Sequence, residues 1–144
     1  MPARREQIIA AMLVRLTEAC PEVAVARNRR SPVDESEAPH LNLLDGGHTT
    51  EYDSGDVIYT MRVDIDGTVT AETDDEIGTA LNALYVQALT AFADDLTLGG
   101  LCTDVCEETL DVRIAPTAEA ATPMADFTLG LQVEFRTLDG DPTG

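Results

Sequence analysis

Residues 126–137, DFTLGLQVEFRT, alternate between apolar side chains and polar residues or glycine without a break. Side chains of a β-strand point to opposite faces in turn, so this period predicts a strand with one buried face. Residues 56–67 repeat the pattern. The apolar positions of the two segments are Phe127, Leu129, Leu131, Val133 and Phe135, and Val57, Tyr59, Met61, Val63 and Ile65. Both segments therefore require a sheet whose apolar face is covered by other elements.

Two amphipathic segments are predicted to form the helices that cover this face. Residues 3–19 and 74–93 both place apolar side chains three and four positions apart, which is the spacing of one helix face. Pro21 ends the first helix, and Thr73 with Glu76 predicts a capping box at the start of the second. The predicted buried stripes are Ile8, Met12 and Leu16, and Ile77, Leu81 and Leu84.

Shorter alternating segments predict the remaining strands, at residues 22–29, 40–47, 68–72 and 109–115. Asp66-Gly67 is typical of a two-residue hairpin turn, here between the strand at residues 56–67 and the return strand at residues 68–72. The predicted order is α-β-β-β-β-α-β-β. We therefore expect an α+β fold, a two-layer sandwich of a mainly antiparallel sheet with two helices packed on one face. Residues 1–144 are expected to form a single domain with extended loops near 30–55 and 115–126.

Charge is distributed unevenly along a chain whose formal net charge is −18. Residues 1–33 carry six arginines against three glutamates, whereas residues 34–144 carry three arginines against 24 acids. All nine cations are arginine. This asymmetry favours head-to-tail contacts between unlike surfaces of neighbouring copies, although chance asymmetry in an acidic protein is the alternative.

The sequence gives little support for an enzyme, a metal site or a cofactor. Cys102 and Cys106 have a spacing that matches zinc ribbons poorly, and the histidines are distant in sequence. A calcium loop that starts at Asp64 fails, because Val69 occupies position 6, where a glycine is needed, and because the predicted flanking elements are strands and not helices. No apolar run resembles a signal peptide or a membrane span. We expect a soluble protein inside the cell, without catalytic residues, metal or cofactor.

Several segments together resemble one family of proteins. They are REQIIAAMLVRL, VAVARNRRSP, APHLNLLDGG, YTMRVDIDG, ALNALYVQALTAFADD, LTLGGLCTDV and FTLGLQVEFRTLDGDP. In this arrangement, which spans nearly the whole chain, the sequence resembles the tail terminator proteins of long-tailed bacteriophages and related gene transfer agents. The most specific pieces are RNR-x-x-P, the LTLGGL turn after the second helix, and a final strand that ends in FRT-x-x-GDP.

The resemblance implies a structural role in the virion and no reaction. A homo-hexameric ring would cap the tail tube, stop its polymerisation and join it to the head–tail connector or stopper protein, at the tail–neck junction. Assembly would take place in the bacterial host cytoplasm, and DNA would pass through the ring without specific binding. The surplus of carboxylates agrees with this last point, because it repels phosphate. A neck component such as a stopper or head-completion protein, or a small acidic ligand-binding or regulatory module, are the alternatives.

Three of the nine arginines lie within four positions, in RNRR. We expect them to reach carboxylates on a neighbouring subunit or on the tail tube. The acids that follow in DESE could instead neutralise them within the same loop. The residues assigned to the interface are Arg27, Arg29, Arg30, Asp34, Glu35, Glu37 and Met124.

Overall fold

The computed structural model describes residues 2–116 and 121–144. Its elements are α1 (Arg4–Ala19), β1 (Ala24–Arg27), a short 3₁₀ helix η1 (Glu35–Glu37), β2 (His40–Asp53), β3 (Asp56–Thr70), α2 (Asp74–Thr90), β4 (Asp104–Ile114) and β5 (Met124–Leu138). The five strands form one sheet in the order β1-β2-β3-β5-β4. Strand β1 pairs with β2 in parallel, and all other pairs are antiparallel. The predicted α+β fold class is confirmed.

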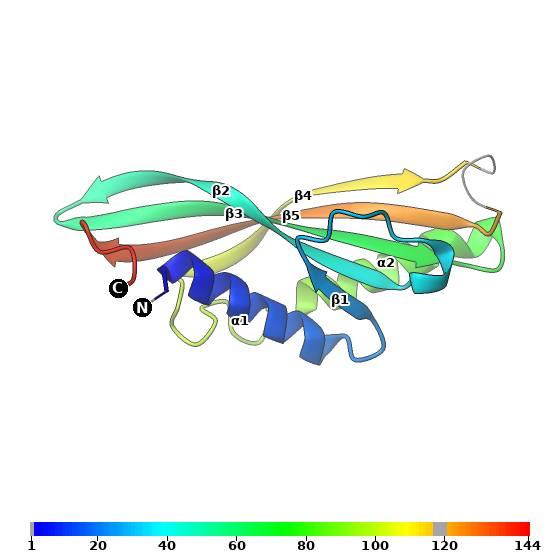
Figure 1. The fold of residues 1–144 in the computed structure, drawn as a ribbon, viewed down its shortest axis with the longest axis horizontal. Helices are drawn as coiled ribbons and strands as arrows, with labels where there is room; N and C mark the ends of the chain where they lie inside the picture. Colours follow the sequence, from blue (N-terminus) through cyan, green and yellow to red (C-terminus); the bar gives the residue numbers. More distant parts are fainter. Residues whose placement is uncertain (1, 117–120) are drawn as a thin grey trace.

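Both helices cover the same face of the long, twisted sheet (Figure 1). The predicted stripes of α1 and α2 are buried in one core together with the alternating apolar residues of β3 and β5. Met12, Leu81, Val63 and Leu131 are each at most 2% exposed. Neither α1 nor α2 covers the opposite face of the sheet, and we call it the open face. No helix in the described part of the chain is long and apolar enough to span a membrane.

The helices begin and end close to the predicted residues, but the predicted capping box does not form. Thr73 occupies the N-cap position of α2 without a side-chain hydrogen bond. Instead, Asp74, Asp75 and Glu76 occupy the first turn, where negative charge interacts favourably with the helix dipole.

The hairpin predicted at Asp66-Gly67 is wrong, and the predicted strands 56–67 and 68–72 are one continuous strand, β3. Gly67 pairs with Phe127 of β5. A Cβ atom at Gly67 would lie 2.2 Å from the Phe127 ring. This glycine therefore leaves room for an aromatic ring of the neighbouring strand and does not make a turn.

Glycine has the same role in β2, where a strand was predicted only over residues 40–47 and a loop was expected from there to residue 55. Residues 40–53 are a strand with a bulge between Asp45 and His48. A Cβ atom at Gly46 would lie 2.1 Å from the Arg62 carbonyl oxygen, so the bulge brings the two backbones into close approach. The turn between β2 and β3 lies at Ser54 and Gly55, whose φ angles of 50° and 90° are those of a hairpin turn. Within the other predicted loop, residues 124–126 belong to β5, and residues 117–120 lie outside the described residues.

We predict that Gly67→Ala destabilises the protein by about 1–3 kcal/mol, because the added methyl group displaces the Phe127 ring from a packed core. Gly47→Ala is the matched control, since no heavy atom lies within 4 Å of a Cβ there. The control should stay within about 0.5 kcal/mol of the parent. Urea titration measures both, and equal losses would show that Phe127 does not depend on Gly67.

Leu131→Ala and Leu84→Ala should each cost about 2–5 kcal/mol of unfolding free energy, because each removes a buried side chain from the core. Leu131 is 0% and Leu84 3% exposed. Val86→Ala, at a 51% exposed position of the same helix as Leu84, is the control and should have little effect. Losses below about 1 kcal/mol at both leucines would contradict the assignment of this core.

Candidate interaction surface

The arginine-rich segment leaves β1 and crosses onto the open face of the sheet (Figure 1). Asn28, with a φ of 54°, turns the chain directly after β1. Asn42 of β2 then holds the backbone of Arg29: its side-chain oxygen accepts the Arg29 N–H at 3.0 Å, and its amide donates to the Arg29 carbonyl at 2.9 Å. Asn42 is only 8% exposed. Asn42 was not among the predicted site residues, although its polar side chain interrupts the apolar run of residues 41–44.

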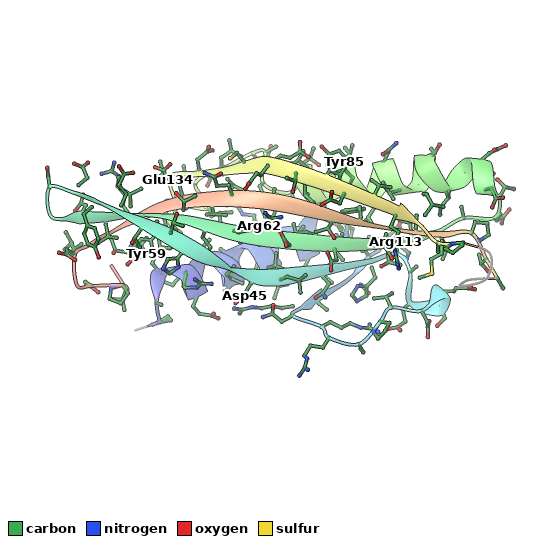
Figure 2. All side chains as sticks on the ribbon, turned by 90° about the horizontal axis from the view of Figure 1, so that it is seen from above. Asp45, Tyr59, Arg62, Tyr85, Arg113 and Glu134 are labelled. Carbon is green, nitrogen blue, oxygen red and sulfur yellow. The ribbon has the colours of Figure 1, made fainter. Side chains whose placement is uncertain are left out.

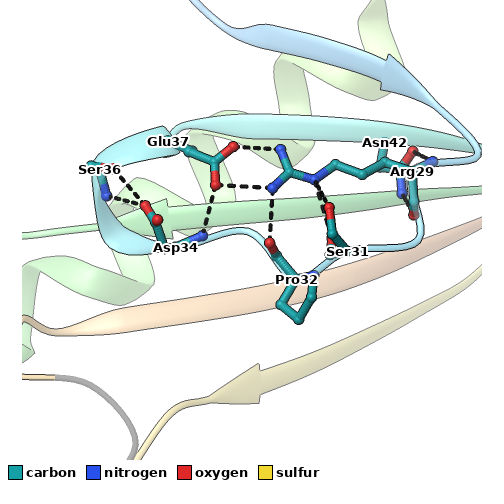
Figure 3. Close-up of polar contacts among 7 residues, drawn as sticks. All are labelled: Arg29, Ser31, Pro32, Asp34, Ser36, Glu37 and Asn42. Carbon is teal, nitrogen blue, oxygen red and sulfur yellow. Dashed lines mark hydrogen bonds and ion pairs between the residues drawn. The ribbon is translucent and has the colours of Figure 1, made fainter.

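Arg29 binds Glu37 of the same loop in a bidentate ion pair (Figure 3). The Nη2–Oε1 distance is 2.9 Å, and Arg29 also donates to the carbonyl oxygens of Ser31 and Pro32. The guanidinium group lowers the pKa of Glu37 from 4.5 to about 2. For Arg29, the alternative in which the DESE acids neutralise the cluster is therefore correct.

The other two acids of the DESE segment fix η1 in place. Asp34 caps this short helix by accepting the Ser36 N–H at 2.9 Å, and Glu37 accepts the Asp34 N–H in return. Glu35 accepts the backbone N–H of Thr122 at 3.2 Å, and hydrogen bonds from Thr122 lower its pKa. This contact attaches the loop to the segment that precedes β5.

Arg27 lies on the helix-covered side and joins three elements. Its guanidinium donates to both carboxylate oxygens of Glu6 in α1, each at 2.8 Å, and to Asp45 in β2 at 2.7 and 3.0 Å. These contacts raise the pKa of Arg27 and lower the pKa values of Glu6 and Asp45. Neither acid was predicted as its partner, because both are distant from it in sequence.

Arg30 differs from its neighbours: it is exposed and forms no ion pair with any residue that the structure describes. It lines a groove of about 640 Å³ between the crossing loop and the open face. Arg29 and Met124 line the same groove. Of the seven predicted interface residues, Arg29, Arg30 and Met124 therefore lie together at the groove. The three acids lie at or beside η1, and Arg27 lies apart from both groups.

Carboxylates form much of the groove floor. Asp66 accepts a hydrogen bond from Thr128 at 2.8 Å, and Asp126 accepts from Thr68 at 3.1 Å and from Arg113 at 3.3 Å. Burial raises the pKa of Asp66. The open face could be identified from the sequence, because the alternation of β3 directs Arg62, Asp64 and Asp66 away from the core. Arg62 and Glu134 lie on the open face in Figure 2.

Most arginines are already paired within the chain. Six of them form ion pairs with carboxylates: Arg15, Arg27, Arg29, Arg62, Arg113 and Arg136. The surface outside these pairs is therefore dominated by unpaired acids. This reduces the capacity of the arginine cluster to bind carboxylates on another copy.

The described residues hold no group of three or more histidine, cysteine, aspartate or glutamate side chains suited to a metal ion. Cys20 and Cys102 are buried free thiols, and burial raises both pKa values, that of Cys102 to about 11. These two groups are therefore poor nucleophiles at neutral pH.

Comparison with known proteins gives a similarity of fold. No protein-family model and no curated protein sequence matches the chain. Among solved structures, the fold is similar to a chain from the virion of a native gene transfer agent particle, with a TM-score of 0.52. The match covers 90% of this chain and 95% of that chain, at 11% sequence identity. The shared architecture therefore extends over most of both chains.

We predict that Arg29→Gln raises the pKa of Glu37 from about 2 toward its ordinary value of 4.5. Because the folded-state pKa is lowered, the contact stabilises the loop above about pH 4.5 and is lost as the pH falls toward 2. Carboxyl NMR titration measures the change directly. Arg30→Gln, which removes a neighbouring cation outside the ion pair, is the control and should leave the Glu37 titration unchanged. An unchanged Glu37 in Arg29→Gln would contradict the ion pair.

Proposed function

We propose that this chain is a structural protein of a phage-like particle, and that it acts as a tail terminator. Six copies would form a ring that caps the tail tube, ends its polymerisation and meets the head–tail connector. The main support is the fold similarity to a gene transfer agent virion chain over 90% of this chain and 95% of that one. The sequence resemblance to tail terminators provides the more specific assignment.

The chemistry of the surface supports a role in assembly. The polar residues of the candidate surface hold their own loop and strands together through ion pairs and hydrogen bonds, as Arg29 does with Glu37. Such contacts hold the loop against the sheet and fix the shape of a docking surface. A tail terminator needs no more than this, because its partners are other proteins.

The excess of acids fits a ring through which DNA passes. Non-specific DNA binding depends on many contacts between cations and phosphates. Here the net charge is −18, and six arginines are already bound to carboxylates of the same chain. A surface of this kind repels a polyanion and lets it slide past.

The structure changes which residues we assign to contacts with partners. Arg27 and Arg29 have carboxylate partners within the subunit, so their primary role is to hold β1 and the crossing loop. Arg30 and Met124, at the groove, are the remaining members of the predicted set that we assign to the contact with the tail tube or connector.

Deletion of the gene from a particle-producing strain tests the function. We expect tails of uncontrolled length that do not join heads, as seen by electron microscopy, because nothing would cap the tube. The wild-type gene supplied in trans is the control and should restore tails of uniform length. Mass measurement of the purified protein on tail tubes should give six copies per tube end.

Two outcomes would redirect the assignment. Tails of normal length that fail to join heads would indicate a stopper or head-completion protein. Normal, infectious or DNA-transferring particles in the deletion strain would contradict a structural role in the neck.

A further inference from the structure

The two free edges of the sheet are aligned with each other along the strand direction. Strand β1 is one edge and β4 is the other. The pairing register places Val25, Leu41, Gly67, Phe127 and Val112 on a single row across all five strands. The next row runs from Ala26 to Asp111 in the same way, through Asn42, Asp66 and Thr128.

The two edges also run in opposite directions. One parallel and three antiparallel pairings separate β1 from β4, so the two strands are antiparallel. A second copy placed beside the first in the same orientation therefore brings its β1 antiparallel to β4. Copies related in this way use two different surfaces for each contact, which generates a ring where the rotation between copies closes and an open filament where it does not.

The backbone groups at both edges are available for such pairing. Ala24 and Asn28 donate their N–H groups toward β2, so Val25 between them directs its N–H away from the sheet. Ala115 donates to Met124 of β5, and alternation along β4 directs the N–H of Val112 outward as well. The outward groups of Val25 and Val112 lie on the same row.

Side chains at the two edges are compatible. Val112 and Ile114 point to the helix-covered side, yet they are 52% and 53% exposed, because α2 packs against β3 and β5. Residues 24–26 of β1 are Ala-Val-Ala and bring no charge to the acidic strand β4. By contrast, pairing β4 with a second β4 would oppose acids to acids, since Asp104, Glu107, Glu108 and Asp111 all lie on it. The part of β2 beyond its pairing with β1 is also a free edge. It carries Glu51 and Asp53, so pairing it with β4 would again oppose acids to acids.

We propose that β4 of one copy pairs with β1 of a second copy, in the register that continues the rows of the sheet. Val25 of one subunit then lies beside Val112 of the other, and the α1 that packs against that β1 covers Val112 and Ile114. The contact is β-strand addition: main-chain hydrogen bonds provide affinity, and the alternate side chains provide register. This inference names a contact within the proposed ring and rests on that proposal for the closure of the ring.

A cysteine pair tests the register. Ala26→Cys with Asp111→Cys, in a Cys106→Ser background, places two thiols on the open face in a non-hydrogen-bonded pair about 4.5 Å apart between Cα atoms. This separation lies within the range that a disulfide accepts. We expect mild oxidation to give covalent multimers on a non-reducing gel. The matched control, Ala26→Cys with Asp104→Cys, moves the second thiol along the same face of β4 and should remain monomeric.

The possible outcomes separate this inference from the proposed function. Equal cross-linking of both pairs, no cross-linking of the Asp111 pair, or dimers from Asp111→Cys alone would overturn the β4–β1 contact. If six-copy rings still form in those cases, the proposed function stands without this contact. If the Asp111 pair gives an open ladder and mass measurement detects no six-copy ring, the contact stands and the proposed ring does not.

A proline at the edge provides a second readout. Val112→Pro removes the outward N–H without removing a hydrogen bond to β5, which edge strands tolerate. We expect it to abolish the assembled species at protein concentrations where the parent assembles, with an unchanged far-UV circular dichroism spectrum. Val112→Thr keeps the N–H and should retain assembly. Full assembly of a folded Val112→Pro variant would overturn the proposal.

Discussion

The pairing of β3 with β5 is the constraint on which the rest of the structure depends. The two strands pair continuously from Asp56–Leu138 to Thr70–Met124, and one face of this ribbon is apolar over its whole length. At one position the pairing requires a glycine, since the Phe127 ring lies across Gly67. Two helices are needed to cover so long an apolar face, and the other strands extend it on both sides.

The sequence was sufficient to predict the parts of the fold that depend on periodicity. Alternation identified the long strands, helical spacing identified α1 and α2, and the resulting core is the observed one. Glycine caused the main errors, because a glycine that makes a turn and one that admits a neighbouring group look alike in a single sequence. Gly46 and Gly67 both belong to the second kind, and they leave room for the Arg62 carbonyl and the Phe127 ring.

The candidate surface was predicted less well, for a physical reason. The arginine cluster was visible in the sequence, and Glu37 was a foreseeable partner because it lies in the same loop. Arg27 instead binds Glu6 and Asp45, which only the packing of α1 and β2 brings together. Asn42 likewise acquires its role only when the crossing loop passes over it. A charge pattern gives the number of cations and acids, whereas their pairing depends on the tertiary fold.

The exclusive use of arginine gives these ion pairs an asymmetric response to pH. A lysine ammonium group loses its proton in moderately alkaline solution, but a guanidinium group keeps its proton throughout the range in which proteins remain folded. The contacts of Arg27 with α1 and β2 therefore persist under alkaline conditions. Of the two directions of pH change, only acidification breaks them, by protonating the carboxylates, so the attachment of β1 to α1 and β2 resists base and weakens in strong acid.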